Sequence, residues 1–477
     1  MNFTSAIFLT SMLPVFLIIY YLLPGITLKN ILLLITSLYF YSTSEPIFIY
    51  FIIGSVFVNY MLAKLIFLSD DCIKRKYLLI ADIVFNVGML AIFKYTDFII
   101  ATINQFFVVN IPKTNLPLPI GISFFTFQAM SYVFDIYYNK DDLHKSTGSI
   151  FDFGLYLTMF PQLVAGPIVR FDDVYKDIYE RKFNVEKINH GLRRFIFGLS
   201  KKILLANTYA IVADTAFSLD PKDAGSSMLF LGAVCYTLQI YFDFSGYSDM
   251  AIGIGQMLGF KFPENFNKPY LATSVTDFWK RWHMTLSSWF RDYVYFPLGG
   301  SKYKMNKTIL NLFIVWLLTG LWHGAKWTFV AWGLLYFLFI SFEKIYKQNH
   351  NRSIDKNLPY ALVRIYTLFV VMVLWIFFRS DSIKGAFLYI FNMLNITNIG
   401  LVNSQAWFYL KQYFGVLLIG ILLSTNFFDF CSKLICVLLP SKHIKNILAS
   451  VYCAILLVLC LLYIVKGGFN PFIYFNF

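Results

Sequence analysis

Two of the six histidines directly follow a tryptophan, as Trp282-His283 and Trp322-His323. His323 lies inside Thr308–Phe342, a stretch with a single formally charged residue. Ionisable groups in membrane segments are costly and usually face a bundle interior or a water-filled path. Burial disfavours the imidazolium, so the ring stays neutral, which is the form that a general base needs. A neutral histidine bound to a backbone carbonyl is the structural alternative, but the repeated Trp-His pair favours His323 and His283 as catalytic residues.

Other common catalytic signatures are missing from the sequence. There is no Ser-His-Asp spacing, GxSxG elbow, Walker loop or GxGxxG motif, and the few histidines and cysteines do not make a metal site. The six cysteines are scattered without a CxxC pair, which favours buried free thiols over metal or disulfide roles. A base without a protein nucleophile indicates direct transfer of a group to an acceptor hydroxyl.

The composition predicts the elements that hold these residues. With 58% hydrophobic and only 14% charged residues, the chain has the composition of an integral membrane protein. Apolar segments of about 20 residues, the length of a membrane-spanning helix, recur from Ala6–Leu23 through Leu448–Val465. We predict an all-α polytopic protein with about 11 to 13 crossings. It forms one membrane domain, 1–477, with N-terminal helices in 1–115, a catalytic core in 116–345 and C-terminal helices in 346–477.

The basic residues predict the orientation of the chain. Lys29 follows the first apolar segment, which by the positive-inside rule places the N-terminus outside. The net charge of +14 is attributed to cytoplasmic loops that face anionic membrane lipids, and no nucleic-acid motif is visible. The strongest charge cluster, Arg170–Lys202, is a solvated loop or surface helix, or alternatively contributes cations to donor binding.

Three stretches predict broken helices. Thr308–Phe342 is too long for one crossing and short for two, so we expect an interruption at Gly320 and Gly324, or two short arms around His323. The Pro- and Gly-containing stretches Leu116–Gln128 and Phe160–Phe171 should end helices and line a cavity.

The segment Asp277–Tyr293 predicts an amphipathic helix. On a helical wheel, Trp282 shares an apolar face with the other aromatic residues, and His283 lies at the border. The opposite face carries the polar candidates for substrate contact or support, namely Asp277, Arg281, Ser287, Arg291 and Asp292. The helix either anchors the protein at the headgroup level or lines a water-filled cavity.

A second polar patch interrupts an apolar segment at Tyr241, Asp243 and Ser245. Carboxylates in such a position are costly unless they are paired or hydrated. The patch therefore either lines a substrate tunnel or pairs with Arg281, Arg291 or another buried cation.

The chain resembles the membrane-bound O-acyltransferases, in particular the bacterial membrane subunits that O-acetylate alginate and peptidoglycan. The resemblance runs end to end and is carried by LPIGISFFTFQ, FPQLVAGPIVRF, YFDFSGYSDMAIGIGQMLGF, FWKRWHMTLSSWFRDYVYFPLGG, GLWHGAKWTFVAWG, WIFFRS and the tail NPFIYFNF. It implies helices around a central channel, with His323 as the central catalytic histidine and His283 as its polar partner. Trp322 and Trp282 belong to the same motifs and are candidates for tunnel or support roles. Where relatives commonly carry His-Gly, this chain has Tyr336-Phe337.

The resemblance also implies a reaction. The expected donor is a cytoplasmic thioester, acetyl-CoA, which is not a permanently bound cofactor and which donates an acetyl group across the bacterial inner membrane. An esterase-like partner outside the membrane then passes it to a polysaccharide. His323 would deprotonate the acceptor hydroxyl, while His283 would orient the thioester or donate a hydrogen bond. The alternatives are D-alanyl transfer to teichoic acid from a carrier protein, a transporter or channel, and a scaffold for an extracellular acetylase.

Overall fold

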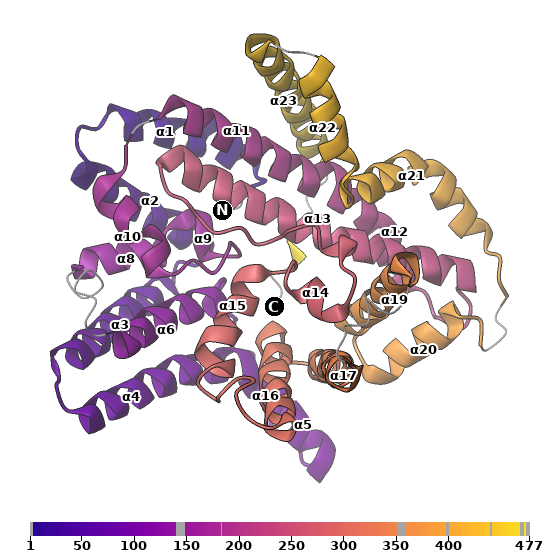
Figure 1. Cartoon of the computed structure of the whole chain (residues 1–477), viewed down its shortest axis with the longest axis horizontal. Helices are drawn as coiled ribbons and strands as arrows, with labels where there is room; N and C mark the ends of the chain where they lie inside the picture. The colour runs from indigo at the N-terminus through magenta and orange to yellow at the C-terminus, as the bar shows by residue number, and fades with distance from the viewer. Residues whose placement is uncertain are drawn as a thin grey trace. The chain divides into compact units, whose positions relative to one another are not determined.

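The chain is helical throughout the part that its computed structural model describes. This part comprises residues 3–139, 148–182, 184–350, 359–396, 400–438, 441–467 and 472–473, and Figure 1 shows its helices in chain order. No strand occurs in these residues. The predicted all-α class is therefore confirmed.

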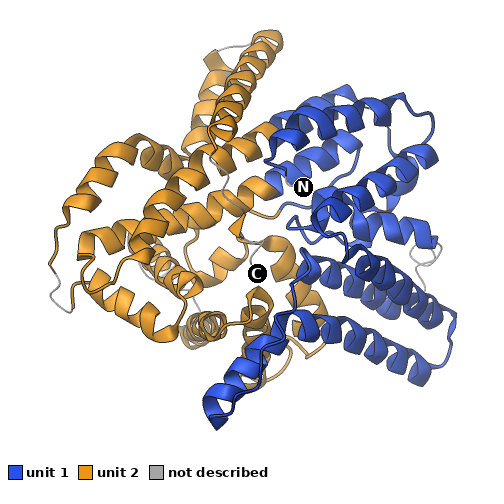
Figure 2. Cartoon of the chain, turned by 180° about the vertical axis from the view of Figure 1, so that it is seen from behind, with its two compact units in different colours: residues 1–195, 248–264 blue, residues 196–247, 265–477 orange. Residues whose placement is uncertain are grey.

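The helices form two compact units, which Figure 2 shows in blue and orange. Unit 1 comprises residues 1–195 and 248–264, and unit 2 comprises 196–247 and 265–477. Two helices, α11 (Val185–Ser200) and α13 (Ser226–Leu258), run from one unit into the other. The division at 115 and 345 that the sequence predicts remains a prediction.

The remaining helices of unit 1 carry the N-terminal apolar segments. They are η1 (Phe8–Met12), α1 (Leu13–Leu22), α2 (Ile26–Ser44), α3 (Ile49–Leu68), α4 (Cys72–Leu90), η2 (Ala91–Tyr95), α5 (Thr96–Phe107), α6 (Ile122–Tyr138), α8 (Ile150–Thr158), α9 (Phe160–Leu163) and α10 (Phe171–Glu180).

Unit 2 contains both Trp-His pairs. Its helices are η3 (Lys201–Ala206), α12 (Asn207–Ser218), η4 (Pro269–Leu271), α14 (Val275–Trp279), α15 (Met284–Phe290), η5 (Arg291–Tyr295), α16 (Met305–His323), α17 (Trp327–His350), α19 (Tyr360–Arg379), α20 (Ile383–Met393), α21 (Ser404–Leu423), α22 (Phe427–Leu438) and α23 (Lys442–Val465).

Ten helices of the described residues are long and apolar enough to cross a membrane. Three of them are much longer than one crossing requires: Cys72–Phe107 with 36 residues, Val185–Ser218 with 34 and Ser226–Leu258 with 33. The first apolar segment, predicted as a span over Ala6–Leu23, forms a shorter apolar helix over Phe8–Leu22. Together these helices give a polytopic membrane protein.

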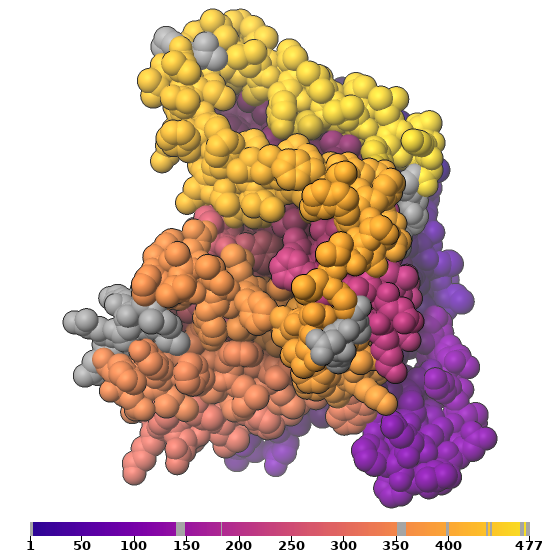
Figure 3. Space-filling model, turned by 90° about the vertical axis from the view of Figure 1, so that its right-hand side faces the viewer, coloured from indigo at the N-terminus to yellow at the C-terminus, as the bar shows by residue number. Residues whose placement is uncertain are grey.

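The C-terminal helices present apolar side chains at the surface. Trp407 and Phe408 on α21 are 57% and 60% exposed, and Val451 on α23 is 52% exposed. Figure 3 shows α21 to α23 in orange to yellow in the upper part of the view. Such surfaces are stable where lipid covers them.

Both predicted helix breaks in unit 1 are present. The stretch Leu116–Gln128 becomes helical only at Ile122, and Phe160–Phe171 contains the short helix α9 followed by a buried non-helical segment. The two breaks lie against each other, because a Cβ on Gly121 would come within 2.7 Å of the carbonyl oxygen of Leu163. Gly121 also has φ of +78°, a conformation that glycine adopts without strain.

The stretch around His323 agrees with the prediction in part, because it is broken at Gly324 with one helix on each side of the break. It forms two full helices, α16 and α17, which extend beyond it at both ends, and the break falls after His323 and not at Gly320. Gly320 instead allows the helices to pack closely, since a Cβ there would lie 2.6 Å from the carbonyl oxygen of Phe329. His323 is therefore the last residue of α16, at the connection between the two helices.

Five cysteines are free thiols, of which three are buried, as the sequence predicts, while Cys72 is exposed and Cys431 is partly exposed. They are Cys72, Cys235, Cys431, Cys453 and Cys460. The side chain of Cys436 lies outside the described part of the chain.

Candidate active site

The segment that carries His283 is broken at the histidine itself. A continuous helix over Asp277–Tyr293 was predicted, but α14 ends at Trp279 and α15 begins at Met284. His283 has φ of 44° and ψ of 55°, a left-handed conformation that costs a non-glycine residue about 1–2 kcal/mol. The predicted continuous helix is thus wrong, although the aromatic face on the wheel up to Phe290 is buried as expected.

A loop that precedes α14 holds this break in place. The backbone N–H of Met284 donates to the carbonyl oxygen of Asn265 at 2.9 Å, and the N–H of Asn267 donates to the carbonyl oxygen of Arg281 at 2.9 Å. These bonds use backbone groups that a helix would otherwise pair internally. The turn is therefore stabilised by residues that lie well before it in the sequence.

The start of α14 is fixed by Glu343 on α17. Its carboxylate accepts hydrogen bonds from the N–H groups of Val275 at 2.7 Å and Thr276 at 2.9 Å, and from the Thr276 hydroxyl at 2.6 Å. A carboxylate at a helix N-terminus satisfies N–H groups that have no partner within the helix. Because Glu343 is nearly buried, this contact ties α14 firmly to α17.

The hydrogen bonds of Asn265 determine the tautomer of His283. The Oδ1 atom of Asn265 accepts from the Thr285 hydroxyl at 2.9 Å and lies 3.0 Å from Nδ1 of His283. An amide oxygen can only accept, so Nδ1 of His283 carries the hydrogen and Nε2 carries the lone pair. This tautomer leaves Nε2 of His283 able to accept a hydrogen bond, while the predicted catalytic role of His283, to orient the thioester or donate a hydrogen bond, remains a prediction.

His283 is uncharged at physiological pH. The residue is fully buried, and desolvation lowers the pKa of its imidazole to about 3. The ring packs edge-to-face on Phe244, with centroids 4.7 Å apart, and contacts Trp322 at 5.8 Å. A neutral ring of fixed tautomer results.

His323 lies in the same aromatic cluster. It is 1% exposed, and its ring packs edge-to-face against Trp322 and Trp332, both with centroids 4.9 Å away, and against Phe378 at 5.3 Å. Trp322 thus contacts both imidazoles. The structure brings the two predicted catalytic residues to the same indole, although they are 40 positions apart in the sequence.

Several polar atoms in this cluster have no hydrogen-bond partner among the described residues. They are Nε1 of Trp282 and of Trp332, Oγ1 of Thr328 and the hydroxyl of Tyr336, all of which are buried. The ring of Tyr336 packs on that of Trp332, with centroids 5.0 Å apart. Buried polar groups normally find a partner in protein or ordered water, so these atoms mark a place that can receive water or a polar substrate.

The polar residues predicted on the wheel form local ion pairs. Arg281 pairs with Asp277 at 3.0 Å, and Arg291 pairs with Asp292 at 2.7 Å. All four side chains are at least 22% exposed, so they are set apart from the buried histidines. The side chain of Ser287 is partly exposed, and its backbone N–H donates to the carbonyl oxygen of His283. Their role in substrate binding remains a prediction.

The patch on α13 is paired with a different cation. Asp243 forms a buried ion pair with Lys202 and not with Arg281 or Arg291, and its second oxygen accepts from the N–H of Ile473 at 2.8 Å. Both side chains of the ion pair are 2% exposed. The alternative of pairing with another buried cation is thus confirmed for Asp243, and two residues of the C-terminal motif NPFIYFNF, Phe472 and Ile473, are held near it.

The other two members of the patch are also buried. Tyr241 packs on Tyr270 at 5.2 Å and on Trp282 at 6.1 Å, within the aromatic surroundings of the Trp-His turn. The hydroxyl of Ser245 has no hydrogen-bond partner within the described residues.

Asn265, Glu343 and Lys202 were not among the predicted site residues. Asn265 lies in a polar loop of the sequence. Glu343 directly follows an apolar run, where a charged residue commonly marks the end of a membrane span. Only Lys202 gave a signal, as a basic residue at the border of an apolar segment. Each acts through a contact that is distant in sequence.

Comparisons with known proteins match the chain to one family and to several named relatives. A sequence profile of the membrane-bound O-acyltransferase family matches residues 121–383, which include both histidines. A probable alginate O-acetylase of Pseudomonas aeruginosa is 39% identical over 391 residues, which cover 81% of this chain and 73% of that protein. A peptidoglycan O-acetyltransferase of Helicobacter pylori is 31% identical over 100% of this chain and 97% of its own length. A teichoic acid D-alanyltransferase of Bacillus subtilis is 31% identical, but over 47% of this chain and 58% of its own.

Proposed function

The chain belongs to the membrane-bound O-acyltransferase family, and on this premise we propose that it transfers an acetyl group from acetyl-CoA to a polysaccharide hydroxyl. The observation that carries the proposal is the pair of buried histidines that share Trp322 in unit 2. The acceptor belongs to the cell envelope or lies outside the cell, as alginate and peptidoglycan do. The enzyme works in the bacterial inner membrane with its N-terminus outside.

His323 acts as the general base in this proposal. One of its ring nitrogens takes the proton of the acceptor hydroxyl, and the oxygen attacks the thioester carbonyl carbon. The carbon–sulfur bond then breaks, the acetyl group remains on the oxygen, and the proton passes to the departing thiolate. A positioned base contributes about 10²- to 10⁴-fold to such a reaction.

His283 acts as a positioning residue. A group whose pKa is about 3 is a weak base near neutral pH, so its Nε2 is better suited to accept a hydrogen bond than to remove a proton. The acceptor hydroxyl or the donor amide can supply that hydrogen bond. The indole N–H of Trp332 has no hydrogen-bond partner among the described residues and lies next to His323. It can donate to the oxyanion that develops on the carbonyl oxygen of the thioester.

The acetyl group reaches the polysaccharide by way of an esterase-like protein outside the membrane: this partner supplies the hydroxyl that His323 deprotonates and then passes the acetyl group to the polysaccharide. D-alanyl transfer from a carrier protein is the second candidate, because a D-alanyltransferase also matches this chain. Acetyl transfer is favoured since the acetylating relatives match 81% and 100% of the chain, as against 47% for the D-alanyl relative.

The test uses the purified protein in liposomes with labelled acetyl-CoA. Release of free CoA and acetylation of the acceptor are measured for the wild type, His323→Ala and the control His443→Ala, which changes an exposed histidine. We expect His323→Ala to insert normally and to lose at least 10²-fold in kcat, with the control unaffected. Near-normal transfer by His323→Ala would remove the base assignment, and turnover of a D-alanyl carrier protein in place of acetyl-CoA would replace the donor.

A further inference from the structure

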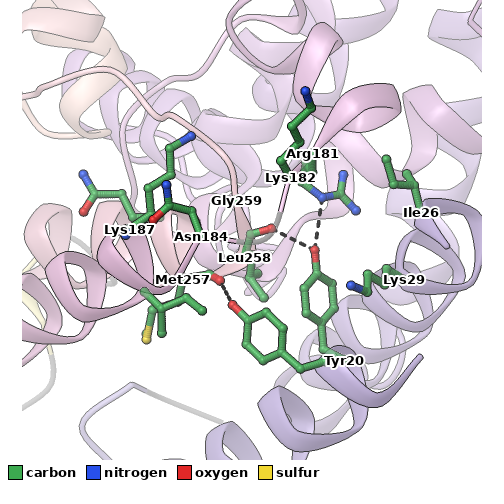
Figure 4. A pocket seen from close by; sticks show the side chains of 13 residues that line it. Tyr20, Ile26, Lys29, Arg181, Lys182, Asn184, Lys187, Met257, Leu258 and Gly259 are labelled. Carbon is green, nitrogen blue, oxygen red and sulfur yellow. Dashed lines mark hydrogen bonds between the residues drawn. The ribbon is translucent and has the colours of Figure 1, made fainter. Parts of the chain in front are cut away.

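A basic pocket lies in unit 1, among residues that the proposed reaction does not use. Figure 4 shows Lys29 and Arg181 on one side of Leu258 and Lys187 on the other. Lys182 is the fourth cation of the lining, and no Asp or Glu lines the pocket in the described part of the chain. The pocket is a shallow cavity of about 30 Å³ that is partly open to solvent.

Two tyrosine hydroxyls form hydrogen bonds with carbonyl oxygens that would otherwise repel an anion here. The last turn of α13 directs its carbonyl oxygens into this region, and the C-terminal end of a helix carries partial negative charge. The Tyr20 hydroxyl donates to the carbonyl oxygen of Leu258 at 2.8 Å, and that of Tyr21 donates to the carbonyl oxygen of Met257. The capped end of α13 is therefore compatible with an anion.

Arg181 is held in a fixed position. Its Nε donates to the Tyr20 hydroxyl at 3.0 Å, its Nη1 donates to the carbonyl oxygen of Asp177 at 2.8 Å, and its Nη2 donates to Oδ1 of Asn30. All three acceptors are uncharged, so the guanidinium keeps its full positive charge. A preorganised cation loses little conformational entropy when an anion binds.

The lysines add charge that is not neutralised. Lys29 lies 5.4 Å from the centre of the Tyr20 ring, and Lys182 and Lys187 are exposed. Within the described residues, none of these three lysines forms an ion pair. Clustered like charges repel each other and are relieved when an anion binds between them.

The start of one helix adds further positive potential. Ile26, the first residue of the 19-residue helix α2, lines the pocket. The first turn of α2 contains no acidic side chain. Helix N-termini favour anions, and phosphate groups in particular.

We infer that this basic pocket is a binding site for a phosphate group, carried by an anionic phospholipid headgroup or by a soluble phosphate compound. The headgroup is the favoured source because α1 and α13 end here and α2 begins here, and apolar side chains next to the pocket are exposed. Leu22 is 77% exposed and Leu28 is 45% exposed, so acyl chains can lie against them while the phosphate meets the cations.

The test measures binding to the full-length protein in nonionic detergent. Short-chain phosphatidylglycerol, short-chain phosphatidylcholine and inorganic pyrophosphate are titrated separately, with calorimetry as the readout. The variant Lys29→Gln/Lys187→Gln removes two cations from opposite sides of the pocket. The control Lys74→Gln/Lys76→Gln removes the same charge from exposed positions of unit 1 that do not line it.

We expect saturable binding of phosphatidylglycerol that the pocket variant weakens about 30-fold and the control leaves unchanged, since each cation near an anionic headgroup contributes about fivefold. The same loss with pyrophosphate alone would assign the pocket to soluble phosphates. Equal binding by the pocket variant and the control, or no saturable binding of either phosphate probe, would overturn the inference. Phosphatidylcholine should bind more weakly than phosphatidylglycerol, and equal affinity would likewise contradict a site built for net negative charge.

Discussion

Replacement of Asn265 by alanine should impair catalysis although the residue is not a proposed catalytic residue. The substitution removes the side-chain oxygen that accepts from Nδ1–H of His283 and from the hydroxyl and N–H of Thr285. The Thr285 hydroxyl can rotate to another acceptor, but Nδ1–H of His283 and the backbone N–H of Thr285 lose this hydrogen bond. Each such loss at a buried donor costs about 1–3 kcal/mol. His283 also keeps its unfavourable left-handed backbone without the contact that fixes its ring.

The expected outcome is reorientation of the imidazole. If about 2 kcal/mol of this cost appears in the transition state, kcat falls about 30-fold, whereas KM for acetyl-CoA changes little. The assay is acetyl transfer in liposomes at saturating donor. Asn267→Ala is the matched control, because only the backbone of this exposed residue contacts the turn.

Asn265→Asp provides a second readout. A carboxylate beside Nδ1 favours the imidazolium and raises the pKa of His283 from about 3. When the pH is lowered, the imidazole of the variant is therefore protonated, and activity is lost, at a higher pH than in the wild type. Folded Asn265→Ala protein with wild-type kcat, together with an Asn265→Asp pH profile that matches the wild type, would refute the role of Asn265.

Three further predictions concern stability, measured by thermal unfolding in detergent. The pKa of His283 is about 3 in the folded protein and near 6.5 in the unfolded protein, so the unfolded state binds more protons below pH 6.5. The free energy of unfolding should therefore fall by about 2 kcal/mol from pH 6.5 to pH 5. Parallel pH dependences for wild type and His283→Gln would contradict this. Gly320→Ala should cost about 1–3 kcal/mol because its Cβ meets the backbone of α17, whereas Gly415→Ala, with open space around it, should cost less than 0.5 kcal/mol, and similar losses would refute the close packing. Lys202→Met should destabilise by about 3–5 kcal/mol, and adding Asp243→Leu should restore most of the loss; strictly additive effects would argue against the buried pair.

The sequence was sufficient for features that depend on local pattern. The helical class follows from long apolar runs, and the breaks near Gly121 and Pro161 follow from residues that interrupt helices wherever they stand. His283 and His323 stood out because ionisable groups are rare in apolar surroundings. The buried aromatic face around Trp282 survived the wrong helix prediction, since the break at His283 keeps those side chains inside.

Features that depend on distant contacts could not be predicted. The turn at His283 forms because Asn265 binds its backbone, and nothing in the local sequence indicates that bond. The end of α16 at His323 was ambiguous because Gly320 and Gly324 both permit a break, and packing on Phe329 selects the second. Asp243 could be recognised as needing a cation, but the choice of Lys202 is made by the tertiary structure.

The carboxylate of Glu343 makes one helix dependent on another. Because Glu343 on α17 accepts hydrogen bonds from the first two N–H groups of α14, a displacement of α17 along its axis must also move α14 and its residue Trp279. Trp279 packs on Trp332, the neighbour of His323. Motion of α17 would thus move Trp279 and Trp332 together, so the packing between these two tryptophans is kept during any such shift.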